Sequence, residues 1–203
     1  MEKTRQGAGL EVEMPEKLRR AARLAPESWI QIVDPAWPQE TPPPVYAIAG
    51  GWRIDANGEP AQFEANPDYR PSPRARGLPE PSDPVDQAVQ LGGSGYGPPD
   101  AVLDELLHAT VAVPIRPDGT LLSGVDGEGA RVIAVYSSPT HAETGGVGAH
   151  RVMSGQQLAI EIPEDLDVLI NPDGVVAARI SARDLRARLA TNGASERTTR
   201  LAD

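Results

Sequence analysis

The 203-residue sequence contains no cysteine, so disulfide bonds and thiolate metal sites are excluded. It also lacks an apolar run long enough to span a bilayer, and its N-terminus carries no apolar signal-peptide segment. We therefore expect a cytoplasmic protein that does not insert directly into a membrane.

Basic residues are scarce relative to acidic ones. The sequence has 19 Lys and Arg against 29 Asp and Glu, which gives a net charge of −10 and a pI near 4.8. Because phosphate binding depends on clustered Lys and Arg, we expect no nucleic acid partner. Lys3 and Lys17 are the only lysines, and this arginine bias, together with abundant Ala, Gly and Pro, suggests a high-GC bacterium.

Aromatic residues make up only 4% of the chain, whereas it has 21 prolines and 20 glycines. This composition predicts long, turn-rich connections around a modest core. The length allows one domain or two small ones.

No sequence motif indicates a cofactor or a metal. The glycine-rich stretch 92–97 lacks the lysine of a phosphate-binding loop, and the three histidines, His108, His141 and His150, lack zinc-site spacing. Acidic residues between 126 and 128 and between 161 and 167 do not follow the order of a calcium loop. We predict no cofactor and no metal.

A hydrolase is considered because Ser137, Ser138 and His141 lie close in sequence. A G-x-S-x-G motif is absent, and turn or helix-cap roles are the simpler interpretation of these serines. We therefore predict no catalytic residue and no enzyme, although a site assembled from distant residues stays an alternative.

The first part of the chain predicts a disordered segment over 1–10 and a short helix over 15–24. Strands are expected at 29–33 and 45–54, with Gly50-Gly51 as a bulge or close backbone approach. Asn57-Gly58 predicts a hairpin that returns through 62–64. The proline-rich stretch 66–84 is a polyproline ligand or a loop that wraps its own sheet, and we favour the second.

The second part predicts helices at 85–90, 99–108, 154–161 and 181–189, and strands at 109–115, 131–136, 166–170 and 175–180. An irregular, glycine-spaced segment is expected between 139 and 153. The apolar strand residues are expected to be buried together in one sheet; they are Val113, Val132, Ile133, Val135, Leu169 and Ile170.

These elements predict an α+β fold with two small, antiparallel-rich sheets flanked by short helices. We expect a tail and short helix over 1–25, a Pro/Gly-rich module over 26–97, an α/β domain over 98–191 and a disordered tail over 192–203.

The second half resembles the SseB family in the order and spacing of its pieces. The stretches that carry this resemblance are Pro114-Ile115, Asp118-Gly119, Val132 to Pro139, and Ile162 to Pro172. The resemblance implies a small SseB-like α/β domain. Two stretches, 125–130 and 144–149, depart from the family pattern.

The first module resembles the leading region of bacterial type VII secretion system-associated proteins. The likeness rests on 29–37, 52–55, 66–73, 79–86 and 95–97. It implies an accessory protein, an adaptor or a chaperone-like factor, that works beside a secretion apparatus by binding a secretion component or secreted substrate. Alternatives are an immunity-type binder of a toxin and an enzyme with an unrecognised site.

Trp, Tyr and Arg side chains of the first module are our candidates for a partner-binding surface, because interface hot spots are rich in these residue types. The candidates are Trp37, Trp52, Tyr69, Arg70 and Tyr96. The competing interpretation, slightly favoured, is that these rings fill the core of a module with few other large side chains.

Overall fold

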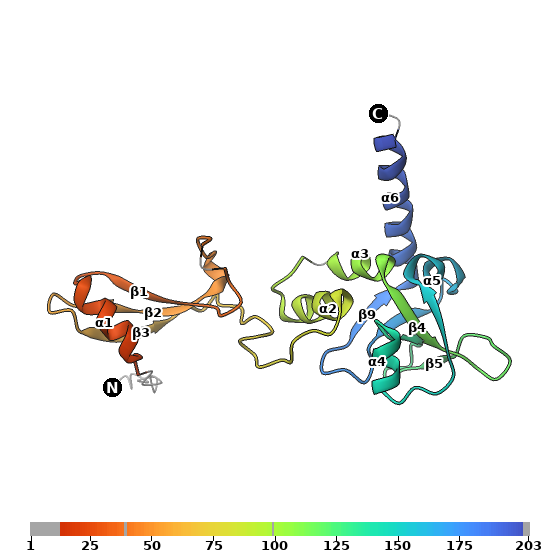
Figure 1. The fold of residues 1–203 in the computed structure, drawn as a ribbon, viewed down its shortest axis with the longest axis horizontal. Helices are drawn as coiled ribbons and strands as arrows, with labels where there is room; N and C mark the ends of the chain where they lie inside the picture. The colour runs from red at the N-terminus through yellow and green to blue at the C-terminus, as the bar shows by residue number, and fades with distance from the viewer. Residues whose placement is uncertain (1–12, 39, 99, 201–203) are drawn as a thin grey trace, which may run out of the picture. The chain divides into compact units, whose positions relative to one another are not determined.

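The computed structural model describes residues 13–38, 40–98 and 100–200. The chain forms two compact units that divide between Arg76 and Gly77 (Figure 1). Six helices and several small, mostly antiparallel sheets occur in the described residues, which confirms the predicted α+β class.

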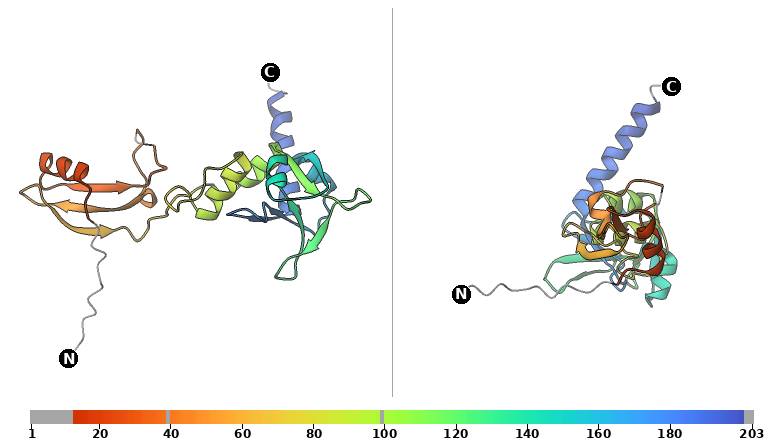
Figure 2. Two further views of the ribbon diagram at one scale, coloured as in Figure 1. Left: turned by 60° about the horizontal axis from the view of Figure 1, so that its bottom comes forward. Right: turned by 90° about the vertical axis from the view of Figure 1, so that its left-hand side faces the viewer.

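The first unit is a three-stranded antiparallel sheet with a helix on one face (Figure 2). Its elements are α1 (Glu16–Leu24), β1 (Trp29–Val33), a short 3-10 helix η1 (Val45–Ala47), β2 (Ile48–Ile54) and β3 (Pro60–Ala65), and the strand order is β1-β2-β3. Alternation in β1 turns Ile30 and Ile32 toward α1, where they pack with Trp52 and Ile54.

Gly50 of β2 is a close backbone approach, as the sequence predicted. A Cβ there would lie 2.5 Å from both the carbonyl oxygen of Glu64 and the ring of Phe63. The β1–β2 register also shifts beside it, between Ile32 and Val33. A side chain at this position would therefore push β3 away from β2.

The first part of the proline-rich stretch, 66–76, packs on its own unit, in agreement with the interpretation we favoured, whereas 77–84 belong to the second unit. The amide of Arg70 donates to the carbonyl of Tyr46, and the side chain of Asn66 donates to the carbonyls of Val45 and Ile48. The buried carboxylate of Asp34 fastens the same loop through a 2.9 Å hydrogen bond from the amide of Ser72.

The second unit combines a four-stranded sheet and a two-stranded sheet with five helices among its described residues (Figure 1). Its elements are α2 (Pro84–Ser94), α3 (Ala101–His108), β4 (Thr110–Pro114), β5 (Ser123–Val125), β6 (Arg131–Val135), α4 (Pro139–Thr144), β7 (His150–Ser154), α5 (Gly155–Glu161), β8 (Asp167–Ile170), β9 (Ala178–Ser181) and α6 (Ala182–Arg200).

The larger sheet has the order β5-β6-β8-β9, and its central strands β6 and β8 are parallel. The smaller sheet pairs β4 with β7, and an isolated bridge between Ala112 and Tyr136 connects β4 to the end of β6. Helices α2, α3, α5 and α6 contribute to one continuous core with both sheets.

The predicted core residues do not all lie in one sheet. Val113 is fully buried but belongs to the β4–β7 sheet, because β7 occupies the place beside β4 that the sequence pattern assigned to no strand. Leu169 is only partly buried. Val132, Ile133, Val135 and Ile170 are buried on β6 and β8, as predicted.

Several boundaries differ from the sequence prediction. Residues 77–97 fall in the second unit rather than the first module, where Val85, Ala88 and Val89 of α2 pack into its core. The segment expected to be irregular contains α4 and β7. Helix α2 also continues to Ser94, through two glycines that were expected to end it.

The C-terminal helix is longer than predicted. Helix α6 runs to Arg200, so the tail predicted to be disordered from residue 192 is helical as far as that residue. Arg188 pairs with Asp104 of α3, and Asn192 also reaches Asp104, which anchors the helix beyond its expected end. The rest of that tail, 201–203, and the predicted N-terminal tail, 1–10, lie outside the described residues.

Candidate functional site

The five predicted partner-contact residues are not all exposed, and they are divided between the two units. Trp52 is 3% exposed and belongs to the core of the first unit, packed against Phe63, so it is not a surface contact. Tyr96 follows α2 in the second unit. Tyr69 is half-buried with its hydroxyl donating to Asp34, whereas Arg70 is exposed.

Trp37 borders a groove of about 410 Å³ in the first unit. The indole N–H donates to the carbonyl of Thr41 over 2.9 Å, and the ring stands edge-on to Tyr46. The groove is lined mainly by apolar side chains; its residues include Leu18, Ile32, Val33, Pro35, Trp37, Pro38 and Pro43. Trp37 is thus half-exposed, with its indole ring held by a hydrogen bond and a ring contact.

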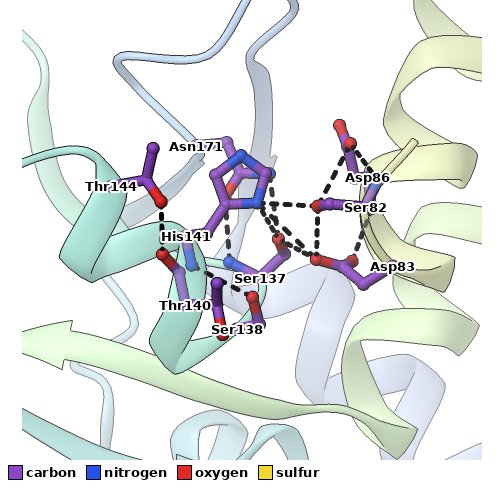
Figure 3. A network of polar contacts seen from close by, with 9 residues as sticks. All are labelled: Ser82, Asp83, Asp86, Ser137, Ser138, Thr140, His141, Thr144 and Asn171. Atoms are coloured by element: carbon purple, nitrogen blue, oxygen red, sulfur yellow. Dashed lines mark hydrogen bonds and ion pairs between the residues drawn. The ribbon is translucent and has the colours of Figure 1, made fainter. Parts of the chain in front are cut away.

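A cluster of polar side chains in the second unit forms the best-defined site (Figure 3). Ser82 and Asp83 precede α2, Ser137 follows β6, His141 lies on α4, and Asn171 follows β8. Since β6 and β8 are parallel neighbours, Ser137 and Asn171 emerge side by side at their carboxyl ends, where open α/β sheets commonly bind ligands.

Local sequence explains how these residues are positioned. Asp83 caps α2 by accepting from the amide of Asp86, with Pro84 at the first helical position. Ser138 caps α4 in the same way, accepting from the amide of His141, so its predicted cap role is confirmed. Two capped helix starts therefore meet at the site.

The innermost contacts involve Ser137 and Asn171, which are both almost fully buried. The amide of Ser137 donates to Asn171 Oδ1 over 2.9 Å, and Asn171 Nδ2 donates to Ser137 Oγ over 3.1 Å. Ser137 Oγ in turn donates to Asp83 Oδ2 over 2.7 Å. This chain links the strand ends to the start of α2.

His141 joins the network through one ring nitrogen. Its Nδ1 lies 3.0 Å from Ser137 Oγ, 3.1 Å from Ser82 Oγ and 3.6 Å from Asp83 Oδ2. Among the residues that the structure describes, its Nε2 makes no hydrogen bond (Figure 3).

The hydrogen bonds of the two serines favour one tautomer of this imidazole. Each serine hydroxyl has one hydrogen: that of Ser137 is directed to Asp83, and that of Ser82 has carboxylate oxygens of Asp83 and Asp86 within reach. When both hydroxyls donate to carboxylates, Nδ1 carries the hydrogen that it shares with the two serine oxygens. In the neutral ring, Nε2 then holds a lone pair and accepts hydrogen bonds.

The pKa of Asp83 is lowered from its ordinary value of 3.8. Burial by itself raises this pKa, but hydrogen bonds from the amide of Asp86 and from Ser137, Ser82 and His141 outweigh the effect. The carboxylate at the centre of the network is therefore anionic at neutral pH.

A pocket of about 340 Å³ adjoins the network and is lined by Ser82, Asp83, Ser138, Thr140, His141 and Thr144. We call it the serine–histidine pocket. In a Ser-His-Asp relay the hydroxyl and the carboxylate contact opposite ring nitrogens. Here they converge on Nδ1, so the arrangement does not match that relay and instead presents hydroxyls and Nε2 for polar recognition.

Sequence reasoning had weighed Ser137, Ser138 and His141 but not their partners Ser82, Asp83 and Asn171. A signal was present in the sequence, because each of the three motifs 82–84, 137–139 and 171–172 places a polar residue before a proline at the boundary of a helix or strand. The described residues contain no group of three or more His, Asp or Glu arranged to hold a metal ion.

A comparison with protein families shows which family the second unit resembles. Residues 87–187 match the family model described as the SseB protein N-terminal domain. We call the matched part of the second unit, 87–187, the SseB domain. This confirms the resemblance inferred from the sequence for this half of the chain.

The SseB domain contains Ser137, His141 and Asn171, while Ser82 and Asp83 lie just before the matched residues. No curated protein and no solved structure matches the chain. In the parts that the structure describes, no helix has the length and apolar character needed to cross a membrane.

Proposed function

We propose that this protein is a cytoplasmic accessory factor of a bacterial type VII secretion system, and that it acts by binding another protein. The SseB domain and the sequence likeness of the first module support this role. The observation that carries it is the convergence of Ser82, Asp83 and Ser137 on His141 Nδ1, which leaves Nε2 for a ligand.

The pocket supports recognition of a polar or cationic group on the partner. Its wall consists of hydroxyls, an imidazole acceptor and the anionic Asp83. The acidic surplus of the chain also lies in this unit, which has 18 Asp and Glu against 9 Lys and Arg, whereas the first unit has 11 against 10. Such a surface favours encounters with a positively charged partner.

Affinity capture of the tagged full-length protein from its own host, read by quantitative mass spectrometry, tests the proposal. The decisive variant is His141→Asn, because an Asn amide can still donate from the place of Nδ1 while the acceptor Nε2 is removed. We expect the parent to capture type VII components or substrates and His141→Asn to lose them. His150→Gln, on β7 of the same unit, is the matched control and should retain them.

The result also separates the alternatives. Capture of a toxin instead of type VII components would favour the immunity role. Hydrolysis of ester or amide substrates by the parent, abolished in Ser82→Ala and in His141→Asn, would favour an enzyme. If His141→Asn captures the same set of proteins as the parent, the pocket does not take part in partner binding.

A further inference from the structure

Strand β1 has an open edge. It lies at one side of the β1-β2-β3 sheet and pairs only with β2 among the described residues. The amide of Ile54 donates to the carbonyl of Ser28, so Ser28 and Ile54 form a hydrogen-bonded pair. In an antiparallel ladder, every second residue of a strand forms such a pair with the same neighbouring strand. Ile30 and Ile32 therefore share their hydrogen bonds with β2, and the amide and carbonyl of Gln31 point away from the sheet.

The two edge strands of this sheet differ in how well they are protected from pairing with another chain. Edge strands usually carry proline, charge or bulges that prevent pairing with another chain. Strand β3 begins with Pro60 and carries Glu64, whereas the five residues of β1, Trp-Ile-Gln-Ile-Val, include neither proline nor charge. Its composition is that of a strand that pairs readily.

The exposed side chains of β1 are arranged symmetrically about Gln31. Trp29 is 50% exposed and Val33 is 37% exposed, and each lies two residues from Gln31. If two copies pair antiparallel about Gln31, each Trp29 lies opposite Val33 of the second copy, on one face of the sheet. Gln31 then faces itself and exchanges both backbone hydrogen bonds.

The Trp37 groove lies on this same outer side. Its lining comes from α1, β1 and the loop after β1, and none of it from β2 or β3. The one charged lining residue, Asp34, is only 2% exposed. Trp29 of a second copy would thus arrive beside Val33 and an apolar, proline-framed groove that contains Trp37.

We propose that a second copy of this chain occupies the open edge of β1. The two first units form a continuous six-stranded sheet, with Gln31 at its two-fold axis and Trp29, Val33 and Trp37 as the apolar contacts. The nearly balanced charge of the first unit, 10 basic against 11 acidic residues, permits this approach. An isologous contact of this kind is closed, and it limits assembly to a dimer.

The mass of the full-length protein in solution, followed by sedimentation or light scattering over a range of concentrations, is the first test. Gln31→Pro removes an N–H that the sheet itself does not use, and edge strands tolerate such a proline. We expect a dimer for the parent and a monomer with an unchanged melting temperature for Gln31→Pro. Ala65→Pro makes the same change on the outer side of β3 and should leave the dimer intact.

Crosslinking provides a second, independent measurement. Because the chain has no cysteine, Gln31→Cys introduces the only thiol, and opposed residues of a hydrogen-bonded pair have Cα atoms about 5.5 Å apart, within disulfide range. Oxidation should join Gln31→Cys chains in pairs and leave Ala65→Cys chains single. A monomeric parent, or a dimer that survives Gln31→Pro, overturns the proposal. A monomeric parent whose capture of another protein depends on Gln31 would assign the edge to a different partner.

Discussion

The hydroxyl of Tyr69 donates a 2.9 Å hydrogen bond to the buried carboxylate of Asp34, across 35 positions of sequence. The same carboxylate accepts from the amides of Ala36 and Ser72. One acidic side chain at the end of β1 thus fixes both the turn toward Trp37 and the proline-rich loop.

Removal of the Tyr69 hydroxyl tests this arrangement. Tyr69→Phe leaves a buried acceptor with one partner fewer, and we expect a loss of about 1 to 3 kcal/mol in the free energy of unfolding of the first unit. Denaturant unfolding, followed by tryptophan fluorescence, measures the effect. Asp68→Asn, an exposed change next to it, serves as the control and should stay within about 0.5 kcal/mol of the parent.

The carboxylate of Asp34 should also make the stability of the first unit depend on pH in the acid range. Its pKa is lowered from the ordinary value of 3.8, because hydrogen bonds from Ser72, Ala36 and Tyr69 outweigh burial, which alone raises it. As the pH falls, Asp34 is therefore protonated at a higher pH in the unfolded chain than in the folded protein. This contribution to stability is complete above pH 4 or so and is lost as the pH falls through the lower folded-state pKa.

Asp34→Asn should be less stable than the parent at pH 7, and the difference should shrink below about pH 4. Unfolding curves of both proteins at pH 7, 5, 4 and 3 check this. A difference that stays constant across these values would mean that the carboxylate charge at Asp34 does not contribute.

The hydroxyl of Tyr136 should make the stability of the second unit fall as the pH rises in the alkaline range. Burial and the 2.7 Å hydrogen bond to Asp173 raise its pKa to about 12. Because the unfolded chain ionises first, near the ordinary value of 10, the stability from the neutral hydroxyl is present below that pH and is lost between pH 10 and 12. Absorbance at the tyrosinate band should show a late ionisation step that disappears in Tyr136→Phe.

Periodic and turn-bounded elements were predictable because their signals are local. The hairpin at Asn57-Gly58, the strands β1, β6 and β8, and the cap at Ser138 follow from residues within a few positions of each other. Strand β7 was missed, because its pattern of His, Arg, Val, Met and Ser becomes a strand only through pairing with β4.

The site was only half predictable for a similar reason. Ser137 and His141 are neighbours in sequence, but Asp83 lies 54 positions before Ser137 and Asn171 lies 34 after it. The parallel pairing of β6 with β8 and the packing of α2 bring them together. Burial likewise distinguishes Trp52 from Trp37, which the sequence could not do.

The buried strand β6 yields a prediction for the core of the SseB domain. Ile133 is fully buried, and Ile133→Ala should cost about 2 to 5 kcal/mol in the free energy of unfolding. Val125→Ala, on the neighbouring strand β5 but 66% exposed, is the matched control and should change it little. Melting of Ile133→Ala within a degree or two of the parent would show that this strand is wrongly assigned.

Among the described glycines, the closest backbone approach lies where α5 begins against the end of α3. A Cβ on Gly155 would lie 1.7 Å from the carbonyl oxygen of Leu106 and 2.6 Å from its carbonyl carbon. Both are backbone atoms, so rotation of a side chain cannot relieve the overlap.

Gly155→Ala must therefore separate α5 from α3 and disturb the core around Leu106 and Leu158. We expect a loss of at least about 1 to 3 kcal/mol, the usual cost of overpacking, although alanine is otherwise the better helix former. Gly148→Ala is the matched control, because a Cβ there meets no atom within 4 Å. Thermal unfolding of the two variants compares them directly, and equal melting temperatures would contradict the close approach of α3 and α5.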